Sequence, residues 1–118
     1  MAYPDGADLG PLRTQSLTIA NGATDSSVLD LSQCTFLALL MPAAFTGVAI
    51  TFKASNAADG TFTVVYDDAG SAVSITVATS RWVGLSSTVM AKLAAFRYLK
   101  LVSGAAEGGA RTIEVVMK

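Results

Sequence analysis

Histidine is absent from this chain of 118 residues, and cysteine occurs once, at Cys34. Histidine is the commonest general base, the usual activator of catalytic serine or cysteine, and the commonest zinc ligand. A single cysteine can form neither an internal disulfide nor a cysteine-rich metal site. We therefore expect a protein that is not an enzyme and that carries no cofactor and no metal. The apolar neighbours of Cys34 predict an inert, buried thiol.

Charge is also scarce, because Asp, Glu, Lys and Arg together make up 14% of the residues and the net charge is −1. The basic residues are scattered singly, so the sequence offers no stripe that would neutralise several phosphates, and we expect no nucleic-acid partner. No apolar run approaches the roughly twenty residues of a membrane span, so we expect no membrane partner. Residues 1–6 lack the basic and apolar parts of a secretory signal. A surface rich in Ala, Gly, Ser and Thr costs little to bury, which favours contact with a partner or a second copy.

Short β-type runs fill most of the chain. Residues 96–102 alternate apolar and polar side chains with the two-residue period of a strand that has one face on a core. Similar runs follow one another between turn sequences such as Asn21-Gly22 and Asp59-Gly60. Residues 86–95 are the one helix-compatible stretch, with Ser86 or Ser87 as its cap. The pattern predicts an all-β, antiparallel, jelly roll-like β-sandwich of seven or eight strands with at most one short helix.

Two segments differ in character, and we expect the boundary between them at residue 16. Residues 16–118 carry the strand signals and are predicted to form the sandwich domain. Residues 1–15 contain two of the prolines and little periodicity, which predicts an extended N-terminal arm. The arm is either a frayed terminus or a segment that orders against a neighbouring subunit. Its candidate inter-subunit contacts are Tyr3, Pro4, Leu9, Pro11 and Leu12.

Trp82 is the main candidate for a ligand or partner contact. It follows Arg81 in the sequence. An aromatic ring for stacking next to a hydrogen-bond donor is typical of carbohydrate-binding sites. Tyr66 would add a second ring to such a site. The alternative is that Trp82 fills the core or the rim of the sandwich, where an amphipathic ring commonly lies. A glycan ligand therefore stays open at this point.

Asp67 and Asp68 are further candidate contacts, because carboxylates on a loop can hold calcium. The sequence Asp-Asp-Ala-Gly is also ordinary turn chemistry, which we favour. We expect Arg81 and Arg97 to pair with Asp67, Asp68 or Glu114 at strand edges, where such pairs contribute little to stability.

Several segments resemble known families. Residues 51–55, then Asp59-Gly60-Thr61-Phe62 and residues 65–70, resemble a pattern in small structural proteins of tailed bacteriophages, as do residues 17–22 with 29–31. Residues 97–101, Arg-Tyr-Leu-Lys-Leu, resemble a strand of discoidin-like, galactose-binding-type jelly rolls. The similarity covers residues 16–118.

The resemblance implies a structural protein of the virion, namely a capsid decoration (cement) protein that stabilises the head shell. It implies the major capsid protein as partner, a homo-oligomer such as a trimer, and a place on the capsid surface after assembly in the bacterial cytoplasm. A tail or baseplate accessory protein is the nearest variant. Because discoidin relatives bind glycans, a carbohydrate-binding module is the alternative function.

Overall fold

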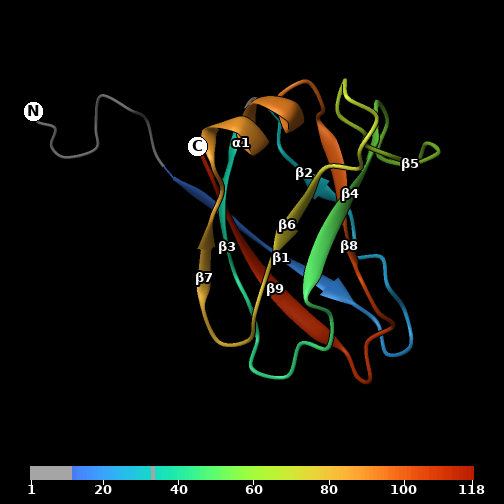
Figure 1. The fold of residues 1–118 in the computed structure, drawn as a ribbon, viewed down its shortest axis with the longest axis vertical. Coiled ribbons are helices and arrows are strands. Elements are labelled where there is room, and N and C mark those ends of the chain that lie inside the picture. The colour runs from blue at the N-terminus through green and yellow to red at the C-terminus, as the bar shows by residue number, and fades with distance from the viewer. Residues whose placement is uncertain (1–11, 33) are drawn as a thin grey trace, which may run out of the picture.

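The computed structural model describes residues 12–32 and 34–118, which form a sandwich of two antiparallel sheets with one short helix at one end (Figure 1). This confirms the predicted all-β sandwich. The elements are β1 (Arg13–Ile19), β2 (Leu29–Asp30), β3 (Phe36–Leu40), β4 (Ala49–Ser55), β5 (Thr63–Val64), β6 (Ser74–Thr76), β7 (Trp82–Gly84), α1 (Ser87–Leu93), β8 (Tyr98–Ser103) and β9 (Arg111–Met117).

The strands are connected in the order of a jelly roll. One sheet has four strands in the order β1-β9-β3-β7, and the other has the order β2-β8-β4-β5, with β6 also paired to β4. Successive strands therefore alternate between the sheets, apart from β4, β5 and β6, which are neighbours in one sheet. With β5 and β6 taken together as one strand, each sheet has four strands, as in a jelly roll.

The structure has nine strands in its described part, against the seven or eight predicted, because the strand beside β4 is interrupted. Both β5 and β6 run antiparallel to β4 along the same edge. Between them the chain leaves the sheet after Val65 and returns at Val73, whose N–H donates to the carbonyl of Val65 at 3.0 Å. Residues 66–72 thus form a tight hairpin that projects from the edge, here called the 66–72 hairpin.

The first strand of the sandwich begins at Arg13, three residues before the boundary that the sequence predicts at residue 16. Arg13, Thr14 and Gln15 lie in β1 and pair with residues 115–117 of β9. Their side chains are polar, so the sequence pattern does not reveal a strand that is held by backbone pairing. Leu12 is exposed. The other predicted arm contacts, Tyr3, Pro4, Leu9 and Pro11, lie outside the described residues.

The core lies between the two sheets. Phe36 of β3 and Phe52 of β4 meet edge to face across it, with ring centroids 6.2 Å apart and an interplanar angle of 87°. The burial of each of these two side chains stabilises the folded state by about 1.5–3 kcal/mol. Further fully buried side chains come from both sheets: Leu17, Ile19, Leu39, Ile50, Leu99, Leu101, Ile113 and Val115.

Helix α1 covers one end of the sandwich (Figure 1). Ser86 caps it, since its hydroxyl accepts from the N–H of Val89 at 3.3 Å. Leu93 is buried and Val89 packs against the core, so the helix has one apolar side, as the sequence predicts. Lys92 reaches Asp67 of the 66–72 hairpin at 3.5 Å. No helix in the described ranges has the length and apolar character needed to cross a membrane.

Candidate functional site

The outward side of the four-stranded sheet is almost free of charge. The strand register places its side chains in rows, and Glu114 is the one ionisable group in them, accepting a hydrogen bond from Ser16. We call this surface the neutral face, and it consists of three rows: Thr18 and Thr112; then Ser16, Glu114, Leu40 and Trp82; then Thr14, Val116, Ala38 and Gly84.

Trp82 stands at the edge of the neutral face, opposite Leu40 on the outermost strand β7. Its side chain is 58% exposed, so it does not fill the core, and its place on an edge strand matches the other alternative, a ring at the rim of the sandwich. Arg81 beside it is also exposed and donates from Nε to the carbonyl of Thr79 at 3.4 Å. A large, accessible ring is therefore present at this edge, as a partner or ligand contact requires.

Tyr66, Asp67 and Asp68 belong to the 66–72 hairpin on the other sheet. Tyr66 is 61% exposed and Asp68 is exposed. The Asp67 carboxylate accepts from the N–H groups of Ser71 and Ala69 at 2.9 and 3.0 Å, and these bonds lower the pKa of Asp67. Asp67 therefore builds the turn, and the five predicted contact residues are distributed over two sheets. Within the described ranges, no group of three or more potential metal-ligating side chains occurs.

The predicted ion pairs of the arginines are wrong. Arg97 pairs with Asp30, with Nε–Oδ1 and Nη2–Oδ2 distances of 3.1 and 3.4 Å. The hydrogen bonds from Arg97 are the main cause of the lowered pKa of Asp30. The sequence could not indicate this pair, because its members lie on β2 and just before β8, which meet only in the folded sheet.

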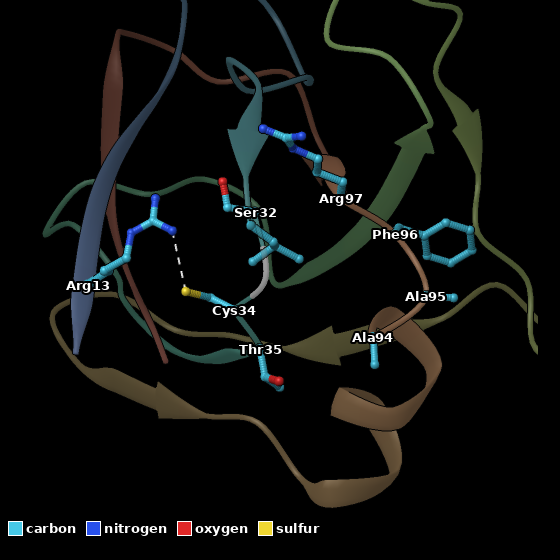
Figure 2. A pocket seen from close by; sticks show the side chains of 9 residues that line it. Arg13, Ser32, Cys34, Thr35, Ala94, Ala95, Phe96 and Arg97 are labelled. Carbon is cyan, nitrogen blue, oxygen red and sulfur yellow. Dashed lines mark hydrogen bonds between the residues drawn. The ribbon is translucent and has the colours of Figure 1, made fainter. Parts of the chain in front are cut away.

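A hollow of about 720 Å³ lies between the start of β1, the turn from β2 to β3, and the connection from α1 to β8 (Figure 2). In this view Arg13 and Arg97 lie on opposite sides of it, with Ser32 between them. The described residues that line it are Arg13, Leu31, Ser32, Cys34, Thr35, Ala94, Ala95, Phe96 and Arg97.

Backbone hydrogen bonds hold the walls of this hollow in place. Leu31 N–H donates to the carbonyl of Arg97 at 2.8 Å, and Thr35 N–H donates to that of Lys118 at 2.8 Å. Cys34 is half-buried, not fully buried as predicted, and its Sγ accepts from Nη1 of Arg13 at 3.3 Å. The sequence gives no signal for this hollow, because three distant segments without a shared motif form it.

Glu107 is a buried carboxylate that no motif in the sequence indicates, with 1% of its surface exposed. Its Oε1 accepts from Thr46 N–H and Arg111 Nε at 2.8 and 3.0 Å. Its Oε2 accepts from Gly47 N–H and Ser103 Oγ at 3.1 and 2.7 Å. Both oxygens are thus fully engaged, which assigns Glu107 to holding loops together and not to chemistry.

No protein-family model and no curated protein matches the chain. Among solved structures, that of the SPBc2 prophage-derived protein YomS is similar, with a TM-score of 0.54. The match covers 91% of this chain and 94% of that chain, at 15% sequence identity. At this identity the likeness shows a common fold alone. The chain therefore shares its jelly roll-like sandwich fold with a prophage-derived protein, and these comparisons do not confirm the discoidin-like resemblance.

Proposed function

We propose that the chain is an accessory structural protein of a phage particle, in the first place a capsid decoration (cement) protein that binds the major capsid protein. The observation that carries the proposal is the neutral face, whose three rows contain one ionisable side chain. Such a surface loses little hydration energy on docking, since few charges must be desolvated. The fold shared with a prophage-derived protein supports a phage setting.

The size of the neutral face favours many weak contacts over one strong contact. Four strands at about 4.8 Å spacing make a face roughly 19 Å wide. The longest strands have seven residues and are about 24 Å long at about 3.4 Å per residue. The flat area of about 450 Å² that results is less than the roughly 800 Å² per partner of a standard stable interface. Copies clustered on a particle, for example as a homotrimer at a symmetry axis, would gain affinity through multivalency.

Co-sedimentation with particles of the phage that encodes the chain tests this proposal. Thr112→Lys places a charge on the neutral face, and Thr76→Lys is its matched control on an exposed position of β6 in the other sheet. We expect Thr112→Lys to weaken binding at least about tenfold, through the cost of desolvating the new charge, and Thr76→Lys to leave binding unchanged.

Separated heads and tails distinguish the variants of the proposal. Binding to heads supports the decoration role on the capsid surface, and binding to tails alone supports a tail or baseplate accessory protein. A wild-type chain that binds neither would contradict the proposal. Equal binding by Thr112→Lys and wild type would exclude the neutral face as the docking surface.

A carbohydrate-binding module is a second candidate, favoured by the exposed ring of Trp82 beside Arg81. On a glycan array, a signal that disappears in both Trp82→Ala and Arg81→Ala, with unchanged melting temperatures, would support it. A wild-type chain without any signal, or a signal that survives both substitutions, would count against sugar binding at this edge.

A further inference from the structure

The outer edge of β7 presents open backbone groups. β7 is the last strand of the four-stranded sheet, and β3 is its one partner among the described strands (Figure 1). The carbonyl of Arg81 accepts from Met41 N–H at 2.9 Å. Because backbone groups alternate in direction along a strand, those of Arg81 and Val83 face β3. The N–H and C=O groups of Trp82 and Gly84 therefore point away from the sheet, and no other group in the described part of the chain bonds them.

The opposite edge of the same sheet, at β1, is covered over much of its length. Thr18 N–H donates to Ser27 Oγ at 3.1 Å, and Ser27 N–H donates to the carbonyl of Thr18 at 2.9 Å. Further along, Nε2 of Gln15 donates to the carbonyl of Val28 at 3.0 Å. Of the two edges of this sheet, that of β7 is thus the more open to a further strand.

The open backbone groups of β7 complement one another across a two-fold axis. When β7 pairs antiparallel with β7 of a second copy about Val83, each Trp82 lies opposite Gly84 of the other copy. Opposite residues of a hydrogen-bonded antiparallel pair exchange both of their backbone hydrogen bonds. This register therefore gives partners to the N–H and C=O groups of Trp82 and Gly84 in both copies.

The side chains fit the same register. Trp82 is exposed on the neutral face, and Gly84 lies on that face as well. A Cβ added at Gly84 would meet nothing within 4 Å, and its φ is not positive, so the fold of a single chain does not require glycine here. Opposite Trp82 of the second copy, glycine leaves room for the ring to lie across the strand, as aromatic side chains do over glycine in sheets. Residues 82–84 carry no charge, so their pairing desolvates none.

The edge of β6 in the other sheet provides a comparison. Val77 N–H donates to the carbonyl of Val48 at 3.0 Å, so the backbone groups of Ser74 and Thr76 point away from β4. This edge offers similar backbone groups, but the side chains beside them are small and polar. Pairing there would bury no large apolar side chain, so β6 serves as the matched control.

We propose that two copies of the chain join edge to edge through β7, antiparallel about Val83, so that their four-stranded sheets form one continuous sheet. Opposite residues of an antiparallel pair lie on the same face, so the two neutral faces become one surface of about 900 Å², twice the area of one copy. This exceeds the roughly 800 Å² per partner of a standard interface. The pairing occupies the open edge of both copies, so assembly stops at two.

The area that the pairing itself buries predicts a weak, reversible dimer. An aromatic side chain buries at most about 150–250 Å², so two rings and one short strand pair stay below the roughly 1,200 Å² of a stable interface. We expect a Kd on the order of 0.1–1 mM. The two copies of Arg81 do not oppose it, because each lies opposite Leu85 of the other copy. They are about 14 Å apart along the strands, beyond the Debye length of about 8 Å at physiological salt.

Sedimentation equilibrium of the purified full chain, from about 10 μM to about 1 mM, measures the Kd. Gly84→Pro removes the outward N–H and places a ring at the edge, while the bonds to β3 stay intact. It should weaken self-association at least about tenfold. Thr76→Pro removes the corresponding outward N–H of β6 and should leave the Kd unchanged.

A cysteine at the centre of the strand tests the register. The two copies of Val83 form a non-hydrogen-bonded pair with Cα atoms about 4.5 Å apart, which is within the range of disulfides. In a Cys34→Ser background, Val83→Cys should give a covalent dimer on mild oxidation. Ile75→Cys is the matched control, because Ile75 is also a half-buried residue at the centre of an edge strand, and it should stay monomeric.

The proposal is overturned if the wild type stays monomeric at about 1 mM or if Gly84→Pro associates as tightly as the wild type. It is also overturned if Thr76→Pro weakens pairing as much, or if Val83→Cys forms no more covalent dimer than Ile75→Cys. Should Gly84→Pro not fold, Trp82→Ala removes the ring without touching the backbone, and an unchanged Kd in this variant has the same consequence. All of these measurements are made without phage particles, so a failure here leaves the co-sedimentation result for the proposed function untouched.

Discussion

Glu107 and Arg111 form an ion pair of 3.0 Å in which the carboxylate side chain is wholly inaccessible to solvent. The same carboxylate binds the backbone N–H groups of Thr46 and Gly47, in the loop before β4. One side chain therefore fastens two loops that are far apart in the sequence. The contribution of these hydrogen bonds to the free energy of unfolding can be measured with glutamine at position 107, because glutamine has the same shape as glutamate but offers one oxygen in place of two.

Glu107→Gln is expected to lower the free energy of unfolding by about 2–4 kcal/mol, since the new amide group faces two donors that then lack an acceptor. Chemical denaturation measures the change. The control is Glu114→Gln on the neutral face, where Ser16 is the hydrogen-bond donor and the side chain is half-buried. We expect less than about 1 kcal/mol there. Equal losses in the two variants would contradict the role assigned to Glu107.

Stability should fall in acid. Burial raises the pKa of Glu107, but the hydrogen bonds from Thr46, Ser103, Gly47 and Arg111 outweigh it and bring the pKa below its ordinary value of 4.5. The unfolded chain then binds protons more readily than the folded chain, so this stabilisation is complete above the unfolded pKa and is lost as pH falls below about 4.5.

Melting temperatures measured from pH 8 to pH 3 check this expectation. Glu107→Gln should show a shallower acid loss than the wild type, because its side chain does not titrate. The sequence contains no histidine that would titrate between pH 6 and 8. A main loss of stability in that range would therefore show that the lowered carboxyl pKa values do not govern the pH dependence.

The sequence predicts the strands well because their apolar side chains alternate, as in β4 and β8, and it predicts α1 from the cap at Ser86. It does not predict what depends on distant pairing. Arg13 joins the sheet only through β9, and Glu107 meets Thr46 across 61 positions of sequence. The hollow is missed for the same reason.

Strand alternation also gives no information on which strand is outermost. The exposure of Trp82 therefore follows from the order of β7 in the sheet and not from its neighbours in sequence. The sequence also does not show that β5 and β6 lie along one edge of β4. The run of residues 61–66 and the run of residues 72–77 each resemble a separate strand, and nothing in the sequence indicates that both pair with β4.

Two glycines should respond oppositely to alanine. Gly70, in the 66–72 hairpin, has a φ of +90°, which a side chain tolerates poorly although nothing lies within 4 Å of the added Cβ. Gly70→Ala should lower the free energy of unfolding by about 1–2 kcal/mol.

Gly84, on the neutral face, has equally open space and no positive φ. Gly84→Ala should raise stability by about 0.5 kcal/mol, since alanine loses less backbone entropy in a strand. Thermal unfolding measures the melting temperatures of both variants against the wild type. A Gly70→Ala protein as stable as the wild type would contradict the claim that the positive φ at this position disfavours a side chain.

Trp82 and Phe52 are large aromatic side chains in opposite environments, 58% and 0% exposed. Phe52→Ala should cost about 3–5 kcal/mol, because it leaves a cavity between the sheets. Trp82→Ala should cost less than about 1 kcal/mol, because the ring contacts solvent over most of its surface. Denaturant unfolding compares the two variants directly.

A large loss in the free energy of unfolding of Trp82→Ala would mean that the ring stabilises the fold. A small loss leaves this exposed tryptophan, on an edge strand beside an almost uncharged face, without a stabilising role in the isolated chain, which is the property expected of a residue that contacts a partner.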